Sequence, residues 1–443
     1  MPSTRRGFLT GSVGFVAAIA GCNEQLSQPN GGGSTVTPVD VPRTNTELLE
    51  EARTIPRPTV PSAVVVSARH HESAIEHARS LLEAVEEAVE AVVDAADVAF
   101  DEPGSPDRSA IDETTQGVTE RLEELNASEP DETTLNSCFE MVGELGQSLG
   151  YLRAHLGDVD EDELKAAMDD ERSSAAALAE TFEYRPATPI AEHLPTLARA
   201  ETRLTGLENH GRAFDNIDTD PDDPYWADWI GHGTAALERH RRHRSDAAAF
   251  YRTATDGDAP SIRDAVEVLT DETTDTLESI HARSRERTPP DGESVLARLQ
   301  RAHTRVGRQS EQRLTALDDD AHPLASLLDA REWLAEYEAV AEAVDRTRSR
   351  QSAEFPAAAV VTEKQRAVER IETAAAGTAL QRRLSAQSER VLRNADTNSQ
   401  QRPEADEKTV VYTHFMYVAA GRWAEQGATD GEALAETIRV RTR

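Results

Sequence analysis

The chain has 443 residues and a formal net charge of -34, from 47 lysines and arginines against 81 aspartates and glutamates. A surface this negative repels phosphate backbones, so we expect no nucleic-acid partner. The two cysteines, Cys22 and Cys138, are too few for zinc sites built from cysteine pairs, and we expect Cys138 to be a small buried apolar side chain.

The chain begins with the stretch TRRGFLTGSVGFVAAIAGC. Arg5 and Arg6 precede an apolar segment over 8–21, which is shorter than the roughly 20 residues that a helix needs to cross a bilayer. Together with Phe8 and Leu9, the two arginines resemble a twin-arginine export signal. The resemblance implies export of the folded protein through the twin-arginine translocase.

The end of this stretch, IAGC at 19–22, resembles a lipobox, in which the cysteine sulfur receives a lipid. The resemblance implies that residues 1–21 are removed as a signal peptide and that Cys22 anchors the mature chain. We therefore expect a protein held by its lipid at the outer face of the cytoplasmic membrane. Two alternatives are an ordinary apolar N-terminal helix and an exported chain that carries no lipid on Cys22.

The next segment, residues 22–61, is rich in Gly, Ser, Thr and Pro, and it lacks an apolar period. This composition predicts a flexible tether between the lipid and the folded part. Basic residues are almost all arginine, with three lysines in the whole chain. Together with the acidity, this usage resembles proteins of salt-loving archaea, so the N-terminal resemblance is to twin-arginine-exported lipoproteins of haloarchaeal type.

Helical patterning dominates the rest of the sequence. Over 78–99, apolar residues recur in steps of four and three, and acidic residues fill the other faces. Segments rich in Pro, Asp and Gly separate further helical runs, and chain reversals there predict antiparallel neighbours. We predict an all-α fold of long antiparallel helices in two helical bundles, over 62–217 and 222–443, with the boundary in DNIDTDPDDP at 215–224. A helical solenoid is the alternative, but no fixed repeat period supports it.

The stretch YWADWIGHGTAALERHRRHR, residues 225–244, is the candidate ligand or metal face. Helical spacing places aromatic residues and histidines on one side, and arginines surround the C-terminal end. This face could hold an anionic ligand or a metal. In the alternative interpretation, the aromatic residues pack into the bundle and the arginines pair with neighbouring acidic helices. The residues of the candidate face are Trp229, His232, His240, His243, Arg241 and Arg244.

Other metal patterns are incomplete. His70 and His77 lie two turns apart, about 10 Å along a helix, which is too far to share one ion directly. Di-iron bundles need a Glu-x-x-His on each of two helices, and Glu278 with His281 is a single such pair.

No catalytic motif stands out. The chain has neither a Gly-rich phosphate loop nor a Gly-x-Ser-x-Gly elbow, and we predict no catalytic residue and no cofactor. Asn126, in Asn-Ala-Ser, is a possible glycosylation site in an exported chain. The resulting hypothesis is a membrane-anchored helical lipoprotein that acts as a binding or scaffold module. The alternative is a helical metal-binding protein or metalloenzyme that uses histidines of the 232–243 face.

Overall fold

A computed structural model describes most of the chain after the predicted signal. The predicted signal residues Arg5, Arg6, Phe8 and Leu9, the lipid site Cys22 and the boundary segment 215–224 lie outside the described residues. The described ranges are 43–95, 107–159, 161–214, 225–287, 294–318, 322–351, 358–400 and 406–442.

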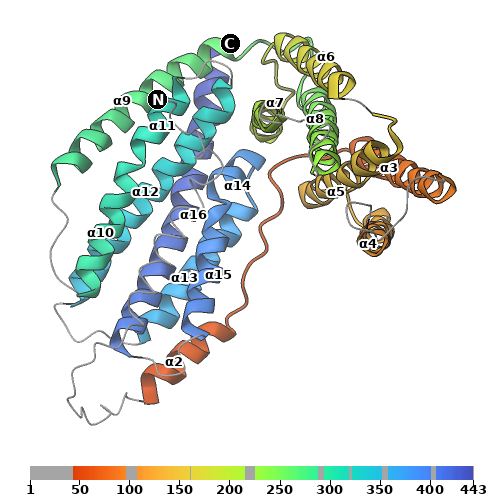
Figure 1. The fold of residues 1–443 in the computed structure, drawn as a ribbon. Coiled ribbons are helices and arrows are strands. Elements are labelled where there is room, and N and C mark those ends of the chain that lie inside the picture. The colour runs from red at the N-terminus through yellow and green to blue at the C-terminus, as the bar shows by residue number, and fades with distance from the viewer. Residues whose placement is uncertain are drawn as a thin grey trace. The chain divides into compact units, whose positions relative to one another are not determined.

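Within these ranges the fold is all-α, as predicted, and the helices form two compact units (Figure 1). Described residues outside the helices pair in an isolated bridge between Pro186 and Thr255. Unit 2 comprises residues 64–188 and 196–261, and unit 1 comprises the described residues up to Ala63, the segment Pro189–Pro195 and the chain from Ile262 onward. Pro195 lies inside a helix, at the point where the chain passes between the units.

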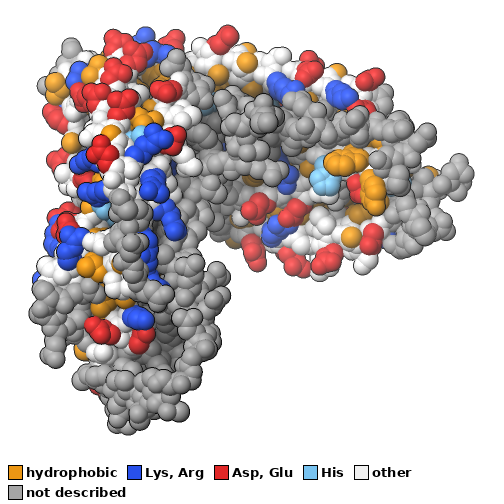
Figure 2. All heavy atoms as spheres, turned by 60° about the vertical axis from the view of Figure 1, so that its left-hand side comes forward, with side chains coloured by type: hydrophobic (Ala, Val, Ile, Leu, Met, Phe, Trp, Pro, Cys, Tyr) orange, Lys and Arg blue, Asp and Glu red, His pale blue; other side chains and the backbone are white. Residues whose placement is uncertain are grey.

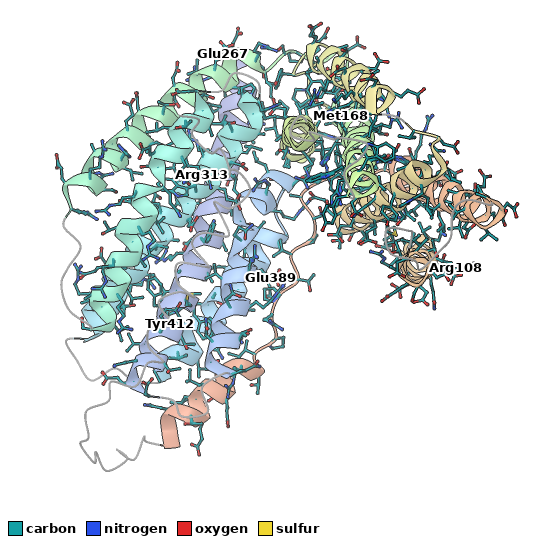
Figure 3. The ribbon with its side chains drawn as sticks, viewed as in Figure 1. Arg108, Met168, Glu267, Arg313, Glu389 and Tyr412 are labelled. Atoms are coloured by element: carbon teal, nitrogen blue, oxygen red, sulfur yellow. The ribbon has the colours of Figure 1, made fainter. Side chains whose placement is uncertain are left out.

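Unit 2 is built around a pair of long helices, α5 and α8, which are antiparallel; α3 packs on both, α4 on α3 and α5, and α6 on α8. Figure 3 labels Met168 on α6, a fully buried residue in the apolar cluster that α6 shares with α8. The helices that supply this unit are α3 (Ala68–Asp94), α4 (Arg108–Asn126), α5 (Glu132–Leu156), α6 (Glu161–Glu180), α7 (Ile190–Phe214, whose first residues belong to unit 1) and α8 (Trp226–Ala254).

Unit 1 has α16 at its centre, against α12, α13, α14 and α15 (Figure 1). Trp333 of α12 and Trp423 of α16 are both 1% exposed in its apolar core. The helices of this unit are α2 (Arg43–Thr54), α9 (Arg263–Glu286), α10 (Val295–Arg308), α11 (Ser310–Leu317), α12 (Pro323–Gln351), α13 (Ala358–Ala375), α14 (Ala379–Ser385), α15 (Gln387–Gln400) and α16 (Glu407–Arg441).

Local sequence signals begin and end the helices. Asp131 caps α5 by accepting the amide of Thr134 at 2.7 Å, and the Thr134 hydroxyl faces the Asp131 amide in return. The helix ends at Gly157, whose φ of 69° lies in the left-handed region that glycine adopts without a steric penalty. In α3, the predicted apolar positions Ala78 and Val85 are fully buried.

Two predicted boundaries need correction. Residues 22–61 were expected to be tether, whereas Arg43–Thr54 form α2, which packs on α13 and buries Leu49 and Ala52 in the core of unit 1. The second bundle was expected to begin at 222, whereas α8 belongs to unit 2 because it packs along α5, and the division falls between Ser261 and Ile262.

Candidate functional site

The predicted ligand face on α8 changes from exposed to buried along the helix. Trp229 is 42% exposed and His232 is exposed, with ring centroids 6.4 Å apart. His240 and His243, two and three turns further on, are 1% and 6% exposed. The structure therefore brings Trp229 together with His232 but places the other two histidines inside unit 2. The physical reason is that Phe139 of α5 packs on the His243 ring, with centroids 4.3 Å apart, and that histidines of α3 pair with carboxylates on the same turns of α8.

The arginines of this face pair with carboxylates. Arg241 donates from Nη1 to Glu238 Oε1 at 2.6 Å, and Arg244 pairs with Glu171 of α6. Glu238 also faces His77 of α3, with 2.9 Å between Nε2 and Oε2. Burial alone raises the pKa of Glu238, but the His77 hydrogen bond and the charge of Arg241 outweigh it, so the pKa is lowered. These partners neutralise the cationic cluster that the sequence suggested for an anionic ligand.

A buried ionic cluster surrounds Asp246, which lies about one turn after His243 on α8. His70 Nε2 lies 2.7 Å from Asp246 Oδ1, and Arg242 Nε donates to the same oxygen at 2.9 Å. Arg203 Nε of α7 lies 3.8 Å from Asp246 Oδ2. The carboxylate is fully buried, and the three cationic or hydrogen-bonding partners are each at most 6% exposed. We call these four residues the Asp246 cluster.

Electrostatics in the Asp246 cluster favour the ionised carboxylate. Burial raises the pKa of Asp246, but the His70 hydrogen bond and the charges of Arg242 and Arg203 lower it further, to about 2. Burial lowers the pKa of Arg203 to about 10, with help from Arg199. Arg203 therefore remains a cation at neutral pH and balances the buried carboxylate.

Two of the three histidines of α3 are structural partners of α8 carboxylates. His70 pairs with Asp246 and His77 pairs with Glu238. Going forward two turns along α3 corresponds to going back about two turns along α8, so the two pairs fix an antiparallel register. The sequence drew attention to His70 and His77 as a pair, but it did not indicate which of the many acidic residues faces them.

Glycines on α5 set the distance to α8. A Cβ at Gly146 would lie 3.0 Å from Ala235 Cα, and one at Gly150 would overlap Thr234 Oγ1. On the opposite side of the contact, a Cβ at Gly231 would lie 2.8 Å from the Gln147 carbonyl oxygen. Small residues at these positions allow the two backbones to approach closely. This close approach buries Thr234 and Ala235, the α8 residues that face Gly150 and Gly146.

Cys138 of α5 is fully buried, as predicted, and it is a free thiol. Burial is the largest influence on it and raises its pKa to about 11, despite the nearby charge of Arg242. The thiol is therefore protonated at neutral pH and is a poor nucleophile.

Unit 1 contains a second group of buried ionisable side chains. Lys364 donates to Asp396 Oδ1 at 2.8 Å, and the Tyr417 hydroxyl donates to the same oxygen at 2.7 Å. On α12, Glu332 pairs with Arg383, whereas Glu336 is 1% exposed and its Oε1 has no hydrogen-bond partner among the residues that the structure describes. Burial raises the pKa of Glu336 well above its ordinary value, and the charge of Arg313 (Figure 3) offsets this only in part.

Metal-ligating groups are dispersed in the described ranges. No three His, Cys, Asp or Glu side chains of these ranges are grouped so that they could hold a metal ion. His281, from the single Glu-x-x-His pair, has its Nδ1 3.3 Å from the Ser310 hydroxyl. The metal-binding alternative therefore draws no support from this part of the chain.

Comparison with known proteins gives two partial similarities. A family model described as a domain of unknown function (DUF8262) matches residues 69–259, and a model of the BopA C-terminal domain matches residues 226–317. The first match covers the helices of unit 2 from α3 to α8, and the second covers α8 to α11. No curated protein and no solved structure matches the chain. Among the described helices, none is both long enough and apolar enough to cross a membrane.

Proposed function

We propose that the protein is an exported lipoprotein, anchored at the outer face of the cytoplasmic membrane, and that its helical body acts as a binding or scaffold module. The observation that carries this proposal is the N-terminal order of residues: Arg5 and Arg6, then Phe8 and Leu9, then the apolar segment that ends at Cys22. The twin-arginine pathway fits a body that packs into two compact helical units, because this pathway carries folded proteins.

The position of α2 gives the anchor a short connection to the body. Helix α2 begins at Arg43 and contributes Leu49 and Ala52 to the core of unit 1. The intervening residues 23–42 span at most about 70 Å when fully extended, at about 3.3–3.6 Å per residue. A lipid on Cys22 would thus hold unit 1 within about 70 Å of the membrane surface.

We assign the binding surface to the start of α8, at Tyr225, Trp229 and His232, which we call the α8 aromatic surface. Tyr225 is 64% exposed and Trp229 is 42% exposed. Exposed Trp and Tyr side chains are typical of protein interfaces, where they bury a large area at low entropic cost. His232 Nδ1 lies 2.7 Å from the Asp228 carbonyl oxygen, so in the neutral ring Nδ1 carries the proton and Nε2 is left as an acceptor.

Membrane fractionation tests the anchor. Cys22→Ser removes the only sulfur that the lipobox offers, so we expect the variant to leave the membrane fraction while the wild type stays in it. Cys138→Ser is the matched control, since it removes the other, buried thiol and leaves the lipid site intact. A Cys22→Ser protein that fractionates like wild type would contradict the anchor.

Affinity capture from membranes tests the binding surface. Trp229→Ala should weaken retention of a captured partner by about 30-fold if this side chain contributes the roughly 2 kcal/mol of an interface hot spot. Val65→Ala is the control because Val65 is 42% exposed, like Trp229, and lies in the same unit just before the start of α3, the end of α3 that pairs with Asp246 and not with the start of α8. Equal retention by the two variants would remove the surface from the proposal.

A further inference from the structure

We propose that Asn126 is an acceptor for an N-linked glycan, an assignment that rests on the export proposed above. Asn126, Ala127 and Ser128 form an Asn-x-Ser sequon whose middle residue is not proline. No other Asn-x-Ser or Asn-x-Thr sequence occurs in the 443 residues. Modification at this motif would therefore place all N-linked glycan of the chain on unit 2.

The structure places the sequon where an enzyme can reach it after folding. Asn126 is exposed and is the last residue of α4, and Ala127 after it is also exposed. The last buried residue of α4 is Leu122, one turn earlier. Accessibility in the folded state matters here because a twin-arginine substrate crosses the membrane folded, so a sequon buried by folding could not be modified outside.

The backbone at the sequon is held by a small number of local hydrogen bonds. The amide of Ala127 donates to the Glu124 carbonyl and the amide of Ser128 donates to the Leu125 carbonyl, both at 3.2 Å. The Ser128 hydroxyl donates to the Leu125 carbonyl at 2.9 Å. Each such bond is worth about 0.5–1.5 kcal/mol net, and helix ends fray readily. The backbone of the sequon can therefore unwind and enter the active site of a transferase without disturbing buried Leu122.

The transfer step needs a glycan donor activated by a phosphate leaving group, such as an oligosaccharide on a lipid phosphate. Nδ2 of Asn126 attacks C1 of the first sugar, a C–N bond forms and the C–O bond to the phosphate breaks. The phosphate leaves with the bonding electron pair, and a base of the transferase takes one proton from the amide nitrogen. The side chain remains a neutral amide, so folding of α4 is not opposed by a new charge.

Mass spectrometry of the protein purified from membranes of its own cells tests this assignment. The tryptic peptide Leu122–Arg153 holds the whole sequon and contains no internal lysine or arginine. In the wild type it should carry a glycan mass, which Asn126→Gln and Ser128→Ala should each abolish. Ser128→Thr is the matched control, since it changes the same half-buried position yet keeps the sequon, and it should retain the glycan.

The N-terminal peptide of the same sample separates failure of this assignment from failure of the proposed function. An unmodified Asn126 in a chain that begins at a lipid-modified Cys22 would overturn the glycan and leave the lipoprotein intact. An unmodified Asn126 in a chain that retains its first 21 residues would overturn both. A glycan that persists in Ser128→Ala would also refute the assignment to this sequon.

Discussion

Replacing Asp246 by Asn should destabilise unit 2 strongly. The carboxylate is fully buried and faces His70, Arg242 and Arg203, each at most 6% exposed. Asparagine keeps the size of the side chain but removes its negative charge, so two guanidinium groups remain buried beside each other without their counter-ion. Leaving a buried charge without its partner costs about 3–5 kcal/mol, because its desolvation is no longer offset.

The pKa of Asp246 gives a second, independent magnitude. In the folded protein the pKa of this carboxyl group falls from its ordinary 3.8 to about 2. At about 1.4 kcal/mol per pKa unit, this shift contributes about 2 kcal/mol of stability. A depressed pKa means that the contribution is fully present above the unfolded-state value near 4 and is lost as the pH falls toward 2. The difference between wild type and Asp246→Asn should therefore shrink in acid.

Hydrogen exchange followed by mass spectrometry is the suitable assay, because it reports unit 2 and unit 1 separately. At pH 7, a loss of 3–5 kcal/mol should speed exchange of the most protected α5 and α8 amides by about 100- to 4000-fold. Asp169→Asn is the matched control: it removes the same charge from an exposed position on α6, where the pair with Arg172 is worth at most about 1 kcal/mol. Equal exchange in the two variants would refute the reasoning.

Three further outcomes follow from packing and burial. Gly150→Ala should destabilise unit 2 by about 1–3 kcal/mol because the added Cβ would overlap Thr234. Gly117→Ala has open space around it and should stabilise α4 by about 1 kcal/mol. Denaturation midpoints that shift in the same direction for both variants would contradict this. Cys138 should resist iodoacetamide at pH 8 until the protein unfolds, and rapid labelling of the folded protein would refute its burial. Glu336→Gln should raise the free energy of unfolding by about 1–3 kcal/mol at pH 7, with the gain vanishing toward pH 4 as the wild-type carboxyl takes up its proton; a loss of stability at pH 7 would contradict the raised pKa.

Helix periodicity explains why the fold class could be predicted. Apolar side chains at steps of three and four must be covered on one face, so the pattern over 78–99 indicated a packed helix before any contact was known. The structure describes the part of that pattern within α3, and it buries Ala78 and Val85. Helix α2 escaped prediction because it is short and flanked by Pro-rich sequence, and its burial comes from α13, which is about 300 residues further along the chain.

The candidate site shows the same limit. The spacing of Trp229, His232, His240 and His243 predicts a shared face of α8, but spacing along one helix does not tell which part of that face another helix covers. Contacts from other helices decide that question, since Phe139 of α5 contacts the His243 ring and histidines of α3 pair with the carboxylates beside the later turns. The exposed aromatic pair and the buried histidines are therefore separated by tertiary packing.

The sequence by itself determined that the chain is a set of amphipathic helices with breaks at Pro- and Asp-rich segments, because helix formation and helix ends depend on neighbouring residues. Only the tertiary structure decided that α8 belongs to unit 2 and that Asp246, among 81 acidic residues, is the partner of His70. Those two residues are 176 positions apart, and an ion pair at that separation depends on the register of two packed helices, which no local pattern encodes.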